Sequence, residues 1–204
     1  MTEPKKAYTY LALGDSYTIG QSVLPSENFP NQTVQLLNQQ NYNFKSPEIL
    51  ATTGWTTDEL QTNINSHTFT LQYDFVSLLI GVNNQYRGRS VENYKPEFES
   101  LLKQAIQFAG GNANRVIVVS IPDWGVTPFA NGRDRAQIAK EIDDYNAANK
   151  YFSVIYKVNY IDITPGSREA ATDLSLVAGD GLHPSAKEYA RWAQKVSTAI
   201  KQQL

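Results

Sequence analysis

The sequence predicts a three-layer α/β/α sandwich around a five-stranded, mostly parallel sheet. Five short apolar runs, rich in β-branched and aromatic residues, alternate with longer amphipathic stretches. Strands separated by crossover helices pair in parallel, and right-handed crossovers place helices on both faces of the sheet. No repeat, low-complexity tract or linker interrupts this alternation, so residues 1–204 are expected to form one domain.

Each strand is predicted from an apolar run bounded by glycine, proline, asparagine or aspartate. The five runs span residues 7–14, 47–52, 75–82, 115–121 and 154–163. Between them, apolar residues at three- and four-residue spacing predict helices. The stripes are Tyr94, Phe98, Leu101, Ala105 and Phe108, then Ile138, Ile142 and Tyr145, and finally Tyr189, Trp192, Val196 and Ile200. Thr56 with Glu59, and Ser185 with Glu188, form capping-box patterns that mark two helix starts.

Composition excludes several classes of protein. Hydrophobic residues make up 41% of the chain, charged residues 19%, and the formal net charge is -2, which is typical of a globular domain and not of a nucleic-acid-binding protein. Without cysteine, covalent catalysis needs another side chain. No histidine and carboxylate cluster with zinc spacing is visible, so neither a metal nor a cofactor is expected. A Walker A loop, a Gly-x-Gly-x-x-Gly fingerprint and a Gly-x-Ser-x-Gly elbow are also missing.

The N-terminal sequence predicts neither a membrane span nor a signal segment. Residues 7–13 are too short and too often interrupted by tyrosine and threonine, and the residues before them are polar. A cytoplasmic protein is therefore expected, whereas a chain from which a leader was trimmed would be periplasmic or secreted. The oligomeric state is left open.

His183 is the histidine best placed to activate a nucleophile. A catalytic serine needs a histidine as base and an acid that orients it. In Asp-Gly-Leu-His, a three-residue separation and one tight turn can bring the Asp180 carboxylate to the imidazole. The alternative is a plain turn before a helix. His67 has no acidic neighbour in sequence and is interpreted as a surface residue, while Asp162, at the end of the fifth run, is a rival orienting acid.

Four polar segments follow predicted strands or precede the last helix. They are Gly-Asp-Ser-Tyr at 14–17, Gly54, Gly-Val-Asn-Asn at 81–84 and Asp-Gly-Leu-His at 180–183. In a flavodoxin-like parallel sheet, ligands bind at the carboxyl ends of the strands, where these segments can meet. In this order, the four segments resemble the blocks of the SGNH, or GDSL-type, hydrolases. The resemblance spans nearly the whole chain and implies a serine esterase or acylhydrolase acting on a small-molecule ester.

Carried over residue by residue, the resemblance assigns Ser16 as the nucleophile, His183 as general base and then acid, and Asp180 as its orienting partner. The backbone N–H groups of Ser16 and Gly54 and the Asn83 side-chain amide would form an oxyanion hole. Without the family context, Gly54 would be interpreted as a loop glycine and Asn83 as a turn residue that ends a strand.

The chain departs from the family pattern at two positions. Tyr17 stands where the family usually has leucine, at a position that varies. Asn84 stands where the family usually has aspartate, which removes a charge beside the oxyanion hole and leaves the shape of that loop open. Asp15 is interpreted as a turn-stabilising residue and not as a catalytic acid.

Substrate contacts are expected from the loops at residues 21–28, 85–89 and 122–133. The candidate binding residues are Trp55, Tyr86, Arg87 and Trp124, with Arg89, Phe129 and Arg133 close to them in sequence. Aromatic rings beside arginines can stack on a sugar or hold an anionic group, although such rings more often only pack.

The absence of a long hydrophobic lid favours short acyl esters, such as acetyl groups on sugars, over triglycerides. A thioesterase or a lysophospholipase would use the same machinery with different acyl and leaving-group pockets. A non-catalytic carbohydrate-binding or scaffold protein on the same fold is the alternative from another class.

Overall fold

The computed structural model describes residues 6–69 and 72–204 and contains the predicted sandwich. Its central sheet has the flavodoxin-like order β2-β1-β3-β4-β5, and every neighbouring pair of strands is parallel. The strands are β1 (Tyr10–Gly14), β2 (Glu48–Ala51), β3 (Phe75–Leu79), β4 (Val116–Val119) and β5 (Asn159–Ile161). The first five residues, which entered the expectation about a leader, lie outside the described residues.

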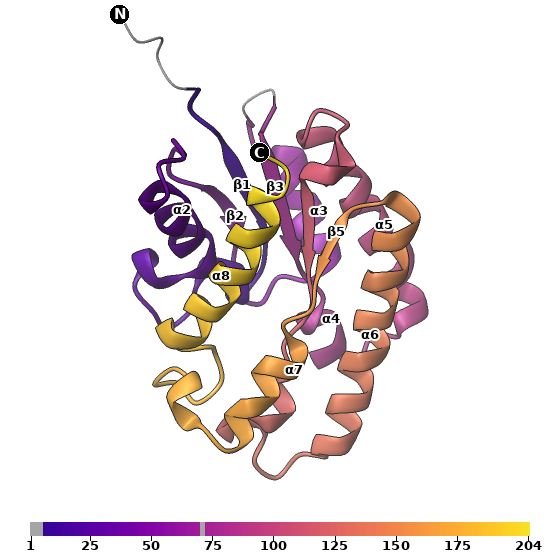
Figure 1. Cartoon of the computed structure of the whole chain (residues 1–204). Helices are drawn as coiled ribbons and strands as arrows, with labels where there is room; N and C mark the ends of the chain where they lie inside the picture. The colour runs from indigo at the N-terminus through magenta and orange to yellow at the C-terminus, as the bar shows by residue number, and fades with distance from the viewer. Residues whose placement is uncertain (1–5, 70–71) are drawn as a thin grey trace, which may run out of the picture.

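Helices cover both faces of the sheet, as Figure 1 shows. One face carries α2 (Phe29–Gln39) and α8 (Ala186–Lys201), and the other carries α3 (Thr57–Ser66), α5 (Val91–Phe108) and α6 (Arg135–Tyr156). The short helices are α1 (Ser16–Ile19), α4 (Val82–Tyr86) and α7 (Thr164–Ser167). Single 3₁₀ turns occur at Pro25–Glu27, Ala113–Arg115, Trp124–Val126, Pro128–Ala130, Arg168–Ala171 and Leu174–Leu176. In the described part of the chain, no helix is long and apolar enough to span a bilayer.

The core lies between the sheet and its two helix layers. Strands β1, β3 and β4 are buried along their whole length, as expected for strands covered on both faces. The three predicted apolar stripes are buried as well, except that Phe108 is only half-buried. Trp192, at 1% exposure, is one of the largest buried side chains and packs against Tyr17, Phe29 and Tyr189.

The prediction of a strand over residues 154–163 is wrong in its first half. Val154 and Ile155 belong to the last turn of α6, where they are 71% and 49% exposed, and β5 begins at Asn159. Lys157, with φ +56°, ends the helix in the left-handed conformation. A long helix thus overrides the strand preference of β-branched residues, because that preference depends on packing in a sheet.

Two smaller predictions also need correction. The third strand ends at Leu79, and Val82 belongs to α4, because Gly81 turns the chain at φ +127°. The capping box at Ser185 forms only in part: the Ser185 hydroxyl accepts from the Glu188 N–H, but the Glu188 carboxylate accepts from Trp192 Nε1 at 2.8 Å. The Ser185 N–H is occupied by the carbonyl of residue 176.

Candidate active site

Ser16 opens α1 directly after the buried strand β1. Asp15 caps this helix by accepting a hydrogen bond from the Tyr17 N–H at 3.0 Å, the turn-stabilising contact expected of it. A Cβ atom at Gly14 would overlap the Thr18 hydroxyl and the carbonyl oxygen of the neighbouring strand β3, so glycine is required where the strand turns into the helix. Ser16 therefore lies at the carboxyl edge of the sheet.

Asp180 and His183 contact each other as their spacing predicts. Asp180 Oδ2 lies 2.6 Å from His183 Nδ1, while Oδ1 accepts from the backbone N–H groups of Leu182 and His183 at 2.9 and 3.0 Å. Partial burial would raise the pKa of Asp180, but hydrogen bonds from the Ser22 hydroxyl and the imidazole hold this pKa well below its ordinary value. Because a carboxylate can only accept, Nδ1 carries the proton, and Nε2 is the nitrogen that can take another.

The loop that carries this pair is closed by its own backbone. The Ala178 N–H donates to the His183 carbonyl at 2.7 Å, and residues 177 and 184 form an antiparallel bridge. The imidazole packs edge-on against the Tyr17 ring, with 5.8 Å between the centroids. Tyr17, one of the two departures from the family pattern, is thus in direct contact with the imidazole.

Gly54 and Asn83 approach the same site from two other strand ends. Gly54 has φ +89°, a conformation that favours glycine. The Asn83 Nδ2 group donates one hydrogen to the Trp55 carbonyl at 3.0 Å, which orients the amide and leaves its second hydrogen as a donor. Arg87 secures the Gly54 loop, because it donates to the Gly54 carbonyl at 2.7 Å and pairs with Glu59 at 3.0 Å.

Asn84 stands where the family usually has aspartate, and its hydrogen bonds define the shape of the loop. Its Oδ1 accepts from the Thr57 N–H at 3.0 Å, and its Nδ2 donates to the Thr57 hydroxyl at 2.6 Å. That hydroxyl in turn donates to the Glu97 carboxylate. Asn84 is completely buried and joins α4 to the start of α3. A neutral amide suits this position, because an aspartate here would place a second carboxylate beside the Thr57 hydroxyl.

One cavity of about 180 Å³ brings the candidate residues together. Its lining consists of Ser16, Tyr17, Thr53, Gly54, Val82, Asn83, Tyr86, Trp124, Phe129, Leu182 and His183. Sequence reasoning did not single out Thr53, Val82 or Leu182. Each of them directly precedes a residue that was singled out, so adjacency to the motifs was the signal that could have found them.

The candidate substrate-binding residues divide into two groups. Tyr86 and Trp124 line the cavity, whereas Trp55 packs against the core and Arg87 is held by Glu59 and the Gly54 carbonyl. Trp124 is 4% exposed and Tyr86 is 45% exposed, so one ring forms the inner wall and the other lies at the rim.

Arg133 clamps the aromatic side of the cavity. Its guanidinium lies 5.1, 5.3 and 5.5 Å from the ring centroids of Tyr86, Trp124 and Phe129, respectively, within cation–π range. It also donates to the Tyr86 hydroxyl at 3.1 Å. Trp124 Nε1 donates to Gln85 at 2.8 Å. These contacts fix the wall in place.

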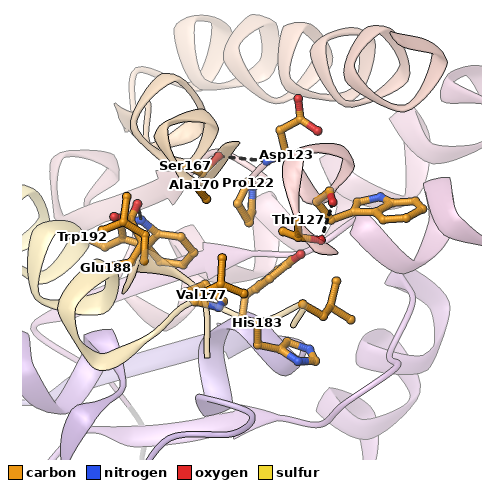
Figure 2. Close-up of a pocket in the computed structure, with 14 residues that line it drawn as sticks. Pro122, Asp123, Thr127, Ser167, Ala170, Val177, His183, Glu188 and Trp192 are labelled. Carbon is orange, nitrogen blue, oxygen red and sulfur yellow. Dashed lines mark hydrogen bonds between the residues drawn. The ribbon is translucent and has the colours of Figure 1, made fainter. Parts of the chain in front are cut away.

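A second cavity, of about 20 Å³, adjoins the first and shares Tyr17, Trp124, Leu182 and His183 with it. Figure 2 shows His183 on one side of it and Asp123 with Ser167 on the other, where the Ser167 hydroxyl accepts from the Asp123 N–H at 3.0 Å. Its volume suits about one water molecule and no substrate group.

His67 and Asp162, the other histidine and the rival orienting acid, do not line the cavity. His67 Nε2 is 2.9 Å from Glu48 Oε1 in an exposed pair that the fold, and not the local sequence, brings together. Asp162 Oδ1 accepts from the Thr164 N–H at 3.1 Å at the start of α7. Within residues 6–69 and 72–204, no group of three or more histidine, aspartate or glutamate side chains is arranged to hold a metal ion.

Comparisons with known proteins show the family and the fold. A model of the GDSL-like lipase/acylhydrolase family matches residues 12–191. The structure of TesA is 16% identical, with 96% of this chain and 99% of that chain covered and a TM-score of 0.74. Axe2, an acetylxylan esterase from Geobacillus stearothermophilus, is 18% identical over 95% and 94%, with a TM-score of 0.73. A lipase/acylhydrolase from Enterococcus faecalis is 17% identical over 97% of each chain, with a TM-score of 0.74. The comparison with curated protein sequences gives no match.

Proposed function

Because this chain belongs to the GDSL-like lipase/acylhydrolase family and is a carboxylic ester hydrolase, we propose that it cleaves short-chain esters through Ser16, His183 and Asp180. The observation that carries the proposal is the shared cavity: Ser16 and His183 both line it, and Asp180 lies 2.6 Å from the Nδ1 atom of the imidazole. A nucleophile, a base and an orienting acid are the three parts that acyl transfer by serine requires.

The reaction follows from these positions. The Ser16 hydroxyl oxygen attacks the ester carbonyl carbon while its proton passes to His183 Nε2. The backbone N–H groups of Ser16 and Gly54 and the Asn83 amide stabilise the tetrahedral oxyanion, each by roughly 3 to 4 kcal/mol. Collapse releases the alcohol, which takes the proton from His183. Water then attacks the acyl-serine with the same base, releasing the carboxylic acid and restoring Ser16.

The size of the cavity supports a short acyl group. Its volume of about 180 Å³ is below the roughly 300–1,000 Å³ of sites for drug-sized ligands. The Tyr86, Trp124 and Phe129 rings bound one side of the cavity, and all three contact the Arg133 guanidinium. A cavity of this size favours a short acyl group over the long chains of a lysophospholipase or a long-chain thioesterase.

Acetyl groups on carbohydrates are the substrates that we propose first. Tyr86 and Phe129, at the rim, are 45% and 42% exposed, which leaves ring surface available for stacking on a sugar. The structural likeness to an acetylxylan esterase is compatible with this choice, although at 18% identity it shows only the fold.

The test is the initial rate on p-nitrophenyl acetate, butyrate and octanoate, measured for the wild-type protein and for Ser16→Ala. We expect the rate to fall with chain length and to vanish in Ser16→Ala while the thermal unfolding curve stays the same. A rate that rises toward octanoate would favour the long-chain alternatives. Failure of a fluorophosphonate probe to label Ser16, together with no hydrolysis, would favour a non-catalytic binding protein.

A further inference from the structure

Ser22 lies in the loop after α1 and contacts the acid of the proposed triad. Its hydroxyl donates to Asp180 Oδ2 at 2.6 Å, and this is the same oxygen that lies 2.6 Å from His183 Nδ1. The other carboxylate oxygen accepts from two backbone N–H groups of its own turn. Ser22 therefore links its own loop to the Asp180 turn, which lies more than 150 residues away in sequence.

The loop that carries Ser22 starts from the nucleophile itself. The N–H groups of Gly20 and Gln21 both donate to the Ser16 carbonyl, at 3.1 and 3.0 Å. The Gln21 side chain accepts from the Thr53 hydroxyl at 2.7 Å, and Thr53 precedes the oxyanion glycine. This short loop thus reaches the nucleophile, the oxyanion side and the acid at once.

The backbone of Ser22 is strained. Its φ of +69° lies in the left-handed region, which a serine rarely adopts because its Cβ crowds the backbone there. Such conformations persist where the surrounding structure requires them, and they are concentrated at functional sites. Glycine would relieve the strain, but it would remove the hydroxyl that reaches Asp180.

We infer that Ser22 is a positioning residue of the triad, which holds the Asp180 carboxylate, and through it the His183 imidazole, in register with Ser16. The inference rests on the proposed function. Ser22 is exposed and is not part of the cavity lining, so it acts on the imidazole through Asp180 and not on the substrate. The loss of one hydrogen bond to a charged group should lower kcat by about tenfold with KM unchanged.

Four substitutions separate the hydroxyl from the backbone. Ser22→Ala removes the hydroxyl and keeps the strain, whereas Ser22→Gly removes both, so equal losses of kcat would assign the effect to the hydroxyl. Ser22→Asn and Ser22→Asp are nearly isosteric and both tolerate the left-handed conformation, but only the amide can donate to Asp180. Ser26→Ala, an exposed serine of the following turn, is the matched control.

The measurements are kcat, KM, the pH dependence of kcat/KM on p-nitrophenyl acetate, and the rate of Ser16 labelling by a fluorophosphonate. We expect Ser22→Ala and Ser22→Gly to lose about tenfold in kcat and in labelling rate, and Ser22→Asn to retain most of both. Ser22→Asp should lose at least as much as Ser22→Ala. In Ser22→Asp, the acidic limb of the pH profile of kcat/KM should also move to higher pH, because a second carboxylate near His183 favours the imidazolium.

Several outcomes would overturn the inference. If Ser22→Ala behaves like Ser26→Ala while wild-type hydrolysis depends on Ser16, the positioning role is wrong and the proposed function stands. If Ser22→Asn and Ser22→Asp have the same kcat and the same acidic limb in their pH profiles, the role of Ser22 is purely structural. If the wild-type protein neither hydrolyses esters nor labels at Ser16, the proposed function fails, and this inference fails with it.

Discussion

The two halves of the proposed active site are built by different means. In the proposed nucleophile half, Ser16 and Asn83 follow the buried strands β1 and β3, and Gly54 follows the partly buried β2; Ser16 itself is 5% exposed. The half with Asp180 and His183 lies on an irregular loop, where the Asp180 side chain is 30% exposed. Ser16 is continuous with the core strand β1, whereas Asp180 and His183 are held by hydrogen bonds within their loop, by the packing of the imidazole against Tyr17 and by the contact with Ser22.

This difference predicts how each half responds to substitution. A packed strand end has few alternative conformations, so its neighbours relax only partially when a group is removed. A loop held by individual hydrogen bonds can shift when one bond is lost. Substitutions in the acid and base half should therefore change alignment and pH dependence, and those in the nucleophile half should change transition-state stabilisation or folding.

After the loss of the nucleophile itself, the largest effect is expected at Asp180. Asp180→Asn keeps the size of the side chain but allows the amide to favour the wrong imidazole tautomer, so kcat should fall on the order of 10⁴-fold. Hydrolysis of p-nitrophenyl acetate and a thermal melt would measure the activity and the folding. Asp162→Asn is the control. Near-normal activity in Asp180→Asn would transfer the orienting role to Asp162.

Asn83→Ala should have the next largest effect. It removes one donor from the oxyanion hole, and kcat should fall by roughly 10²- to 10³-fold with little change in KM. The comparison is with Asn65→Ala on the exposed side of α3, which should leave kcat unchanged. An unchanged kcat in Asn83→Ala would mean that the backbone donors suffice and that Asn83 is only a turn residue.

Asp15 should make stability depend on pH. Burial raises the pKa of Asp15 from 3.8 to about 7, and its Oδ2 atom has no hydrogen-bond partner in the described part of the chain. Between pH 3.8 and about pH 7, the Asp15 carboxyl is ionised in the unfolded chain and neutral in the folded protein. Its contribution to the free energy of unfolding therefore falls as pH rises through that range. From pH 5 to pH 8 its contribution should fall by about 3 kcal/mol.

Asp15→Asn keeps an acceptor for the Tyr17 N–H and removes the titration. Urea unfolding of the wild type and the variant at pH 5 and pH 8 isolates the effect, because the other carboxylates are common to both proteins. The wild type should lose more stability than Asp15→Asn between these two values. Parallel changes in the two proteins would show that Asp15 does not titrate in this range.

Asn84→Asp should have the smallest effect. It replaces the donor to the Thr57 hydroxyl with a carboxylate near Glu97, which should cost about 2 kcal/mol of unfolding free energy. Combining it with Glu97→Gln should recover part of this cost, because one of the two facing charges is removed. Denaturant unfolding of the single and double variants is the measurement. Additive effects would contradict a coupling between these residues.

The sequence by itself determined much of the fold and supplied the main members of the proposed site. The alternation of apolar runs predicts the sheet and its helix layers, because burial on both faces leaves a pattern that can be read locally. The contact between Asp180 and His183 follows from three residues of separation and a tight turn. The proposed roles of Ser16, Gly54 and Asn83 come from the resemblance to the ordered family motifs, each of which follows a predicted strand.

Only the tertiary structure decided the groups that hold these residues in place. Ser22 meets Asp180, Asn84 meets Thr57, and Arg133 meets three aromatic rings across long stretches of chain. It also decided that Val154 and Ile155 end a helix, against their local preference for strands. Such contacts depend on how packed elements are placed relative to one another, and no short-range spacing encodes that placement.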